Sequence, residues 1–365
     1  MPAGRRGSGH HYRRHHSCSS RHRPNEVCSS GHFHPADKLA ARLCPMKPIS
    51  LRSFLILATT SLISSCENSG NQANLDLAST GKPTIAAANY PLAYFAERLS
   101  AEFAEVLFEP VPGTDPAYWE PTDNQVSSIQ QADLILLNGA GYAQWTSSRT
   151  IPYETTVITS TSFEDAFIKL QDGIRHTHKR GTASHTHEGV ASTTWLDLMQ
   201  ASAQASSTAE ALIEQFPEHS DSVSRELESL LTDLGDLDRQ MRTTTAPLRG
   251  ADLVVSHPVY QYWARASELS AHSLHWEPTQ ELGASEMSEL AATRTEGDSA
   301  RYFIWETQPS QENLDKIKAA GFINIVVNPC GGRPANGDFL KVMRENISSL
   351  AQGITQGAST DAVEP

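Results

Sequence analysis

Four histidines with the chemistry of metal ligands lie within twelve residues of one another. They are His176, His178, His185 and His187, in the segment R-H-T-H-K-R-G-T-A-S-H-T-H-E-G. Neutral imidazole is the commonest protein metal ligand, and a loop rich in Gly, Ser and Thr lets several imidazoles converge on one ion. The segment predicts a loop that captures or delivers a metal weakly. A solvated insertion with incidental histidines is the alternative.

Three further candidate ligands follow predicted strands in the second half of the chain. His257 ends the strand in V-V-S-H-P-V-Y-Q-Y, Glu306 follows Y-F-I-W, and His275 follows a shorter plausible strand. Open α/β sheets bind ligands outside the carboxyl ends of their strands, so we expect these three side chains to contribute to a metal site. A strand-capping histidine and a solvated carboxylate are the alternatives. His272 is expected to face elsewhere.

The cysteines exclude a disulfide framework and a thiolate-rich metal site. Of the five cysteines, only Cys66 and Cys330 lie after residue 65, so a metal has to rest on nitrogen and oxygen ligands. Cys330, in N-P-C-G-G, has no partner cysteine and is predicted to be a small buried thiol rather than a nucleophile. The chain also has no P-loop, dinucleotide fingerprint, nucleophile elbow or H-E-x-x-H motif, so no motif supports an enzyme.

The charge of the chain divides into three unlike parts. Residues 1–45 carry eight basic and two acidic side chains, and residues 46–65 carry two basic ones. Residues 66–365 carry 19 basic and 40 acidic side chains, within a formal net charge of −13 for all 365 residues. Nucleic-acid binding needs clustered Lys and Arg, so we expect no nucleic acid among the partners.

Residues 46–65 are typical of a secretory signal. Lys47 and Arg52 precede the apolar run Phe54–Ile63, and small residues follow it. The run is shorter than the roughly 20 residues of a transmembrane helix. The ending I-S-S-C resembles the lipobox of bacterial lipoproteins, which implies that Cys66 is lipidated and anchors the protein to a membrane, in the periplasm or at the cell surface.

The segments on either side of the signal are interpreted from their positions. A signal acts at the N-terminus, so we expect translation to start at Met46 and residues 1–45 to be an extension that is not translated. A His- and Arg-rich tail that binds metal or nucleic acid is the alternative for residues 1–45. Residues 66–82 are polar, small and without periodicity, and they are predicted to be a flexible tether.

The rest of the chain alternates between predicted strands and helices. Strands are predicted at Ile85–Ala88, Glu105–Phe108, Leu134–Leu137, Leu253–Val255, Tyr302–Trp305 and Ile323–Val327. Helices are predicted from Pro91, over Asp123–Gln131, over Gln311–Ala320 and over Phe339–Gln352. This alternation is typical of α/β proteins with mainly parallel sheets flanked by helices. We expect two such lobes, an N-terminal one at 83–215, with the His-rich loop at 175–188, and a C-terminal one at 247–365.

One long helix is expected between the lobes. Apolar residues recur at steps of three and four from Val223 to Met241, and Pro217 is a helix-opening residue. A helix over Glu218–Thr245 would span roughly 40 Å, which is long enough to connect both lobes, so residues 216–246 are predicted to be the connecting segment. A short internal repeat, A-D-L-I-L-L-N at 132–138 and A-D-L-V-V-S-H at 251–257, is expected to mark corresponding strands of the lobes.

In this order, the motifs resemble those of the zinc and manganese solute-binding proteins of bacterial ABC transporters. The resemblance covers about Thr84–Leu350 and includes I-A-A-A-N-Y-P-L-A-Y-F-A, P-G-T-D-P-A-Y-W-E-P-T, Q-A-D-L-I-L-L-N-G-A-G-Y-A-Q-W, T-T-W-L-D-L, V-V-S-H-P-V-Y-Q-Y-W-A and G-D-F-L-K-V-M-R-E-N-I-S-S-L. It implies two α/β lobes joined by one backbone helix. It also implies a lipid-anchored monomer outside the cytoplasm, with an ABC permease as its partner.

The metal ligands that the resemblance implies are only partly kept. The four implied positions are occupied here by Ala117, Thr193, His257 and Asn328. Either the site has been rebuilt around His257 from Glu306, His275 and loop histidines such as His185 and His187, or metal binding has been lost. The concentration of histidines nearby favours a rebuilt site, and an imidazole-rich set favours Zn²⁺ over Mn²⁺.

The expected function is that of a solute-binding lipoprotein of a metal uptake system. It would capture Zn²⁺ between the lobes at the carboxyl ends of the sheets and pass it to an ABC permease, by binding and release without catalysis. The rigid connecting helix favours small rearrangements over a large hinge closure. An adhesin or metal-storage lipoprotein and a metal-dependent hydrolase are the alternatives, and the hydrolase would need an open coordination position and a general base.

Overall fold

The computed structural model describes residues 81–101, 103–110, 115–170, 175–177, 184–186, 189–276, 280–293 and 301–361. The predicted extension, the signal peptide and the tether up to residue 80, with Cys66, lie outside the described residues, as do His178 and His187. For His176 and His185 the structure describes the backbone. None of the described helices combines the length and the apolar character needed to cross a membrane.

The first lobe is built on a four-stranded parallel sheet. Its strands are β1 (Thr84–Ala87), β2 (Glu105–Leu107), β3 (Leu134–Leu137) and β4 (Thr156–Ile158), in the order β2-β1-β3-β4. The helix α1 (Tyr90–Ser100) follows β1, and α2 (Asp123–Gln130) precedes β3. Asn89 starts α1 because its side chain accepts a hydrogen bond from Leu92 N, and Pro91 suits the first turn.

The second lobe has a sheet of the same type. Its strands are β9 (Asp252–Val255), β10 (Ala271–Ser273), β11 (Arg301–Trp305) and β12 (Phe322–Val326), in the order β10-β9-β11-β12, all parallel. The accompanying helices are α5 (Gln261–Ala266), α6 (Ala284–Ala292), α7 (Gln311–Ala319) and α8 (Phe339–Asp361). The expected α/β architecture with two mainly parallel sheets is therefore confirmed.

In each sheet, the strand that comes first in the chain takes the second place in the strand order. By this order β9 corresponds to β1, and β11 corresponds to β3. The expectation that residues 132–138 and 251–257 mark corresponding strands is therefore wrong, because the first segment contains β3 and the second contains β9. Seven similar residues reflect the shared composition of buried parallel strands rather than equivalent positions.

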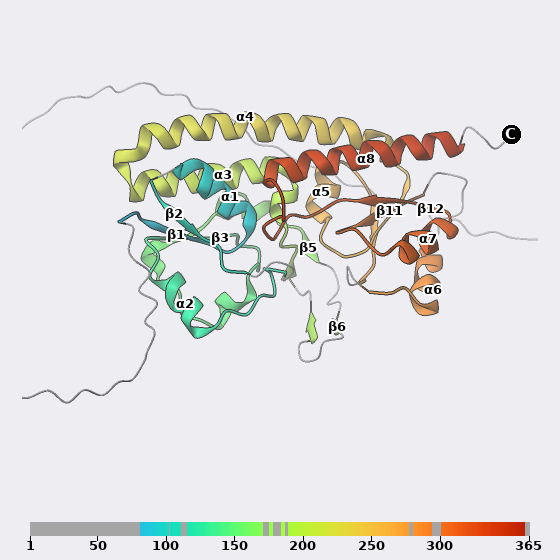
Figure 1. Ribbon diagram of the computed structural model, residues 1–365, viewed down its shortest axis with the longest axis horizontal. Coiled ribbons are helices and arrows are strands. Elements are labelled where there is room, and N and C mark those ends of the chain that lie inside the picture. Colours follow the sequence, from blue (N-terminus) through green and yellow to red (C-terminus); the bar gives the residue numbers. More distant parts are fainter. Residues whose placement is uncertain are drawn as a thin grey trace, which may run out of the picture. The chain divides into compact units, whose positions relative to one another are not determined.

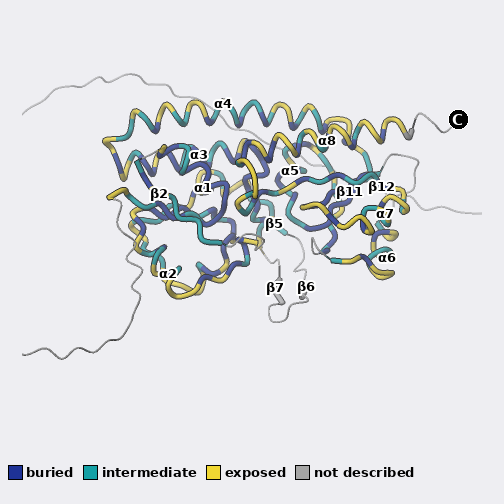
Figure 2. Tube along the Cα trace, viewed as in Figure 1, coloured by how far each residue is buried: buried dark blue, intermediate teal, exposed yellow. Residues whose placement is uncertain are grey.

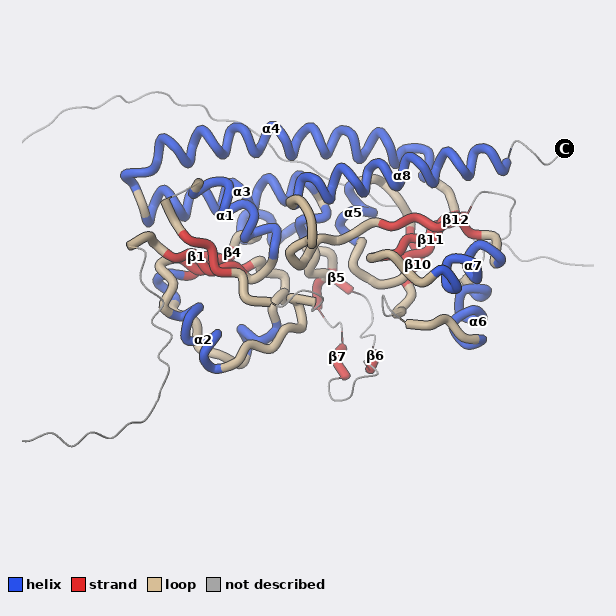
Figure 3. Tube along the Cα trace, in the orientation of Figure 1, coloured by secondary structure: helices blue, strands red, loops and turns tan. Residues whose placement is uncertain are grey.

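The connecting helix α4 (Ser220–Thr245) packs against α1, α3 (Leu198–Gln215) and α8. Figure 1 shows α4 on the same side of the sheets as these three helices, and Figure 3 shows this layer of helices in blue beside the strands of both lobes. The helix begins two residues later than expected because Pro217–His219 forms the 3₁₀ turn η5. Its apolar stripe, which includes Leu230 and Leu237, is buried, and Figure 2 shows its exposed side in yellow.

Short elements occupy the connections. They are η1 (Gln144–Ser147), η2 (Tyr153–Thr155), η3 (Thr161–Ala166), η4 (Thr194–Leu196), η6 (Ala246–Leu248), and the antiparallel pairs β5 (Lys169–Leu170) with β8 (Gly189–Val190) and β6 (Arg175–Thr177) with β7 (Ser184–Thr186). One cluster of buried apolar side chains includes Ile85 and Leu136 from the first sheet together with Leu253 and Ile304 from the second. The two lobes therefore share a hydrophobic core.

The last helix, α8, is nine residues longer than the predicted Phe339–Gln352 and ends at Asp361. Gly353 and Gly357 lie in the added part of the helix, although glycine is a weak helix former. Both glycines are buried against the second sheet. A Cβ atom at Gly353 would overlap Ile325, and one at Gly357 would overlap the Tyr302 hydroxyl. The absence of a side chain at these two positions lets the helix lie close to β11 and β12.

The substitution Gly353→Ala is expected to lower the free energy of unfolding by about 1–3 kcal/mol, because the added methyl overpacks the helix-sheet contact. Gly235→Ala on α4 is the matched control. Its Cβ would meet only Arg239 Nη1, at 3.9 Å, so a gain of roughly 0.5–1 kcal/mol in helix propensity is expected. Urea unfolding followed by circular dichroism measures both values. Shifts of equal sign in the two variants would contradict this account of α8.

Candidate metal-binding site

The pairing of β9 with β11 brings His257 and Glu306 together. Val255 lies opposite Ile304 in the ladder, and Ser256 N continues the pairing by donating to Ile304 O at 2.9 Å. His257 follows β9 by two residues and Glu306 follows β11 by one. Their Nδ1 and Oε1 atoms lie 3.9 Å apart, and their side chains are only 9% and 18% exposed. An imidazole and a carboxylate therefore meet in a largely buried position at the carboxyl edge of the sheet.

His275 approaches the same place from the other neighbour of β9. After β10 ends, Leu274 N donates to Val255 O and Trp276 N donates to Ser256 O, each at 2.9 Å. These bonds fix the backbone on both sides of His275. Its ring lies 6.4 Å from the His257 ring between centroids, with the two planes inclined by 61°. The structure thus brings together the three sequence-predicted residues that follow strands.

The electrostatics around His275 favour the neutral imidazole. Burial lowers the pKa of His275, Glu289 opposes this effect, and His272 adds to it. A neutral imidazole has a lone pair available for a metal ion near neutral pH. His272 itself, on β10, is exposed. It therefore faces away from the buried pair, as its position three residues earlier predicted.

Tyr260 borders the site but does not supply a phenolate. Its hydroxyl donates to Val327 O at 2.6 Å, and the residue is 2% exposed. Burial raises its pKa well above the usual value, and the nearby Glu306 raises it further. The hydroxyl therefore stays protonated at neutral pH. Tyr260 was not singled out by the sequence analysis. Its closeness to His257 in the chain, three residues later, was the signal that could have indicated a residue beside the site.

Asparagines occupy the equivalent positions in the first lobe. Asn89 follows β1 by two residues, as His257 follows β9, and Asn138 follows β3 by one residue, as Glu306 follows β11. Asn89 Nδ2 donates to Asn138 Oδ1 at 3.1 Å. The two lobes thus carry topologically equivalent pairs, and the pair in the first lobe is neutral.

The asparagine pair belongs to a buried amide and hydroxyl network. Asn138 Oδ1 also accepts from Thr194 Oγ1 at 3.1 Å and from Gln204 Nε2 at 3.0 Å. Asn138 Nδ2 donates to Ser192 O at 2.9 Å. Both hydrogen-bonding ends of the Asn138 amide are satisfied, so this network fixes the backbone at 192–194 and has a structural role.

The other positions that the resemblance implies as ligands have local structural roles. Ala117 is 9% exposed, and its carbonyl accepts from Gln144 N at 3.2 Å. Asn328 Oδ1 accepts from Cys330 N at 2.7 Å, which closes the turn after β12. Thr193 Oγ1 donates to Val259 O at 2.5 Å. His257 is thus the one residue with a metal-binding side chain among these four positions.

Cys330 is 3% exposed, as expected for a small buried thiol. Burial raises its pKa to about 12, and Asp338 contributes to this shift. A metal ligand or a nucleophile has to be the thiolate, which is scarce at neutral pH when the pKa is this high. Cys330 therefore takes no part in the candidate site.

In the His-rich segment, the structure describes the backbone of β6 and β7, which pair with each other. In this pairing His176 lies directly opposite His185. Residues directly opposite in an antiparallel pair have Cα atoms about 4.5–5.5 Å apart. This register places two of the four loop histidines next to each other along the backbone, while His178 and His187 lie outside the described residues.

The three gathered side chains do not yet form a complete set of ligands. Among the described residues, no group of three or more His, Cys, Asp and Glu side chains is arranged to hold one metal ion. Tetrahedral zinc with bonds of about 2.0–2.1 Å places its ligands roughly 3.3 Å apart, close to the 3.9 Å between His257 Nδ1 and Glu306 Oε1. If a zinc ion is bound by His257 and Glu306, the His275 side chain would have to move toward them to bind the same ion.

Comparisons with known proteins agree with this architecture. Residues 85–353 match the family model of the zinc-uptake complex component A, periplasmic (ZnuA). The high-affinity zinc uptake system protein ZnuA of Bacillus subtilis is 21% identical over 312 residues, which cover 82% of this chain and 96% of that protein. The manganese-binding lipoprotein MntA of Halalkalibacterium halodurans is 19% identical over 269 residues, covering 71% of this chain and 84% of the relative.

A solved structure gives the same fold. The zinc(II)-bound structure of AdcA from Streptococcus pneumoniae superposes with a TM-score of 0.63 at 19% identity, and the match covers 75% of this chain and 58% of AdcA. The chain therefore spans little more than half of AdcA. The family model covers well over half of this chain. The chain belongs to the ZnuA family of periplasmic zinc-uptake components.

Proposed function

We propose that this protein is the extracytoplasmic solute-binding component of an ABC-type uptake system, and that its cargo is Zn²⁺. The observation that carries the proposal is the buried pair His257 and Glu306, with His275 beside it, at the carboxyl ends of β9, β11 and β10. Transport by such a component consists of binding and release. Membership of the family supports a role as an uptake component rather than as an enzyme.

The chemistry of the ligands favours Zn²⁺ over Mn²⁺. Two imidazoles and one carboxylate suit zinc, whereas manganese prefers sets dominated by oxygen ligands. The lowered pKa of His275 supports this choice, because its ring does not need to lose a proton before it binds the ion at neutral pH. We propose that a loop histidine or a water molecule completes a tetrahedral set.

We also propose that the protein is a lipid-anchored monomer that passes zinc to an ABC permease. The anchor is Cys66, which would follow the cleaved signal at 46–65 and precede the tether at 66–82. In this proposal the lobes at 83–215 and 247–365 are joined by the segment 216–246. Residues 1–45 are not part of the mature protein.

The substitution His257→Ala is expected to weaken Zn²⁺ binding by at least about 100-fold, because even outer-shell partners of a metal site contribute 10–100-fold to affinity. Glu306→Gln keeps the shape but removes the negative charge, so a loss of about 10–100-fold is expected. The Zn²⁺ affinities of the wild type and of both variants, each comprising residues 67–365, are measured by competition with a chromophoric chelator.

The matched control for the third ligand lies on β10, the strand that precedes His275. His275→Ala is expected to weaken binding about 10-fold or more, whereas His272→Ala, three residues earlier and exposed, should change it less than about threefold. Affinities that are equal for wild type and His257→Ala would rule out the proposed site. Equal losses in His275→Ala and His272→Ala would remove His275 from the ligand set.

Deleting residues 176–187 is expected to remove weak zinc sites and to leave one tight site. His176 and His185 lie on the paired strands β6 and β7, outside the sheets that carry His257 and Glu306, and His178 and His187 lie outside the described residues. Isothermal titration should therefore show fewer weakly bound ions per protein, with the tight affinity weakened at most about 10-fold, the effect of one replaceable ligand. If the deletion variant, in which His257 is intact, binds no zinc at all, the tight site lies in the loop and not at His257.

A further inference from the structure

We infer that Thr193 is a positioning residue that bonds the first lobe directly to the backbone that carries His257. This inference rests on the proposed function, since it concerns the same site. Thr193 is 7% exposed, and its hydroxyl donates to Val259 O in the second lobe at 2.5 Å. Val259 N in turn donates to His257 O at 2.9 Å. The backbone N–H and C=O groups of Val259 are therefore both hydrogen-bonded.

The His257–Val259 turn has little freedom of its own. A residue that precedes proline is restricted to extended backbone, and the proline ring fixes proline's own φ angle, so Pro258 limits the backbone of His257 and of itself. The hydrogen bond from Val259 N to His257 O closes a three-residue turn. The hydroxyl of Thr193 ties this compact turn, and with it the His257 side chain, to the first lobe.

The first lobe holds Thr193 firmly on both sides. The carbonyl of Ser192 accepts from Asn138 Nδ2 at 2.9 Å, and the Thr194 hydroxyl donates to Asn138 Oδ1 at 3.1 Å. The Thr194 hydroxyl also lies 3.2 Å from Gln204 Oε1 on α3. The buried asparagine network thus fixes the residue that contacts the second lobe.

Thr193 lies in the middle of a row of contacts between the lobes. The residues at 191, 193, 195 and 197 each bond to the second lobe, from the segment that leads into and through the 3₁₀ turn η4. Their contacts are Ala191 O with Tyr262 Oη at 3.0 Å, Thr193 Oγ1 with Val259 O, Trp195 Nε1 with Pro329 O at 2.7 Å, and Asp197 Oδ2 with Arg265 Nη2 at 3.4 Å.

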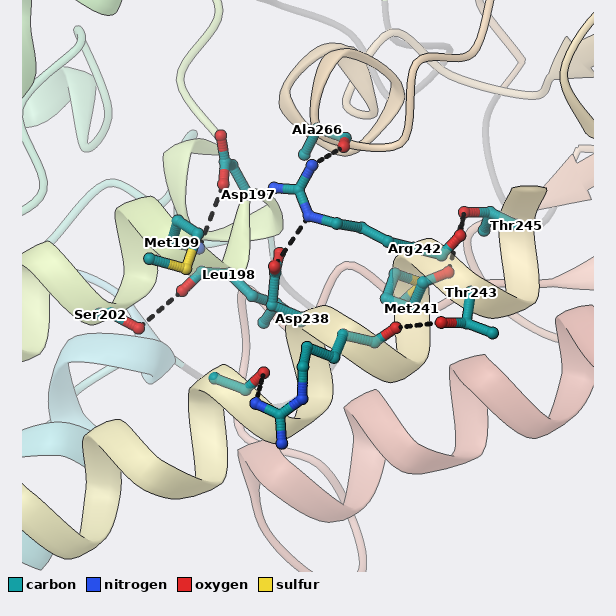
Figure 4. Close-up of polar contacts among 12 residues, drawn as sticks. Asp197, Leu198, Met199, Ser202, Asp238, Met241, Arg242, Thr243, Thr245 and Ala266 are labelled. Atoms are coloured by element: carbon teal, nitrogen blue, oxygen red, sulfur yellow. Dashed lines mark hydrogen bonds and ion pairs between the residues drawn. The ribbon is translucent and has the colours of Figure 1, made fainter.

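The far end of this row is reinforced from the connecting helix. Asp197 starts α3 by accepting from Met199 N at 3.1 Å, and Arg242 on α4 pairs with Asp238 at 2.8 Å. Arg242 also donates to the carbonyl of Ala266, which ends α5. Figure 4 shows Arg242 between Asp238 and Ala266, with Asp197 nearby. The helices of both lobes are therefore held together next to Thr193.

The row gives Thr193 a different role from that of a metal ligand. At the position where the resemblance implies a ligand in the first lobe, this chain has a hydroxyl that bonds to the second lobe without an ion. The lobes are thus joined by direct hydrogen bonds, and the candidate ligands that follow strands all lie in the second lobe. Metal binding would then need no closure of one lobe onto the other.

The test compares Thr193→Val, which keeps the shape and removes the hydroxyl, with Thr193→Ser, which keeps the hydroxyl. Hydrogen-deuterium exchange of the metal-free protein is measured on a peptide that includes Val259. We expect exchange of this amide to be about 3- to 10-fold faster in Thr193→Val and to return toward wild type in Thr193→Ser, because one hydrogen bond is lost or kept. Thr208→Val, which removes a buried hydroxyl bonded within α3, is the control and should leave this amide unchanged.

Zinc affinity of the same variants is the second readout. A 3- to 10-fold weaker affinity in Thr193→Val, rescued in Thr193→Ser, is expected if the turn positions His257. If Thr193→Val speeds exchange at Val259 but the protein binds no zinc, the role of the Thr193 hydrogen bond is supported and Zn²⁺ is rejected as the cargo. Unchanged exchange at Val259 in Thr193→Val would overturn the inference, even if zinc binds tightly.

Discussion

The register between β9 and β11 is the constraint on which the candidate site depends. Parallel pairing of Val255 with Ile304 fixes where both strands end. The residues that follow are then close enough for an imidazole and a carboxylate to lie 3.9 Å apart in a largely buried place. A shift of one residue in this register would turn every side chain to the opposite face and separate the pair. The pairing of β10 with β9 adds His275 by the same mechanism.

The two lobes carry different residue types at equivalent positions after their strands. In the first lobe, Asn89 and Asn138 form a neutral pair that is saturated with hydrogen bonds and holds the backbone at 192–194. In the second lobe, the equivalent positions carry His257 and Glu306, whose side chains can bind a cation. A neutral amide network stabilises a fixed structure, whereas an imidazole and a carboxylate gain from an ion placed between them. The difference explains why the candidate site is confined to the second lobe.

Much of the fold could be predicted from the sequence because its signals are local. Apolar strands such as Leu134–Leu137 and the apolar stripe of α4 appear at the expected places, with bounds that differ by one or two residues. The end of α8 could not be predicted, because Gly353 and Gly357 are explained by close packing on a distant sheet. The correspondence of the lobes was also wrongly predicted, since strand order depends on long-range pairing that a seven-residue repeat does not specify.

The residues of the candidate site could be proposed from the sequence, whereas their geometry could not. His257, Glu306 and His275 were found because each follows a strand, and the sheet brings them to one edge. The roles of Thr193 and Asn138 could not be predicted, because their hydrogen bonds join segments more than 50 residues apart. Thr193 was noted only as an absent ligand, and the side chain instead bonds the two lobes together.

The most direct test of the account is anomalous diffraction at the zinc edge from crystals of residues 67–365 grown with one equivalent of zinc. The account predicts one strong peak within about 2.3 Å of His257 and Glu306, on the side of the second lobe. A peak between Ala117 and Thr193, or a peak confined to the His-rich loop, would contradict it.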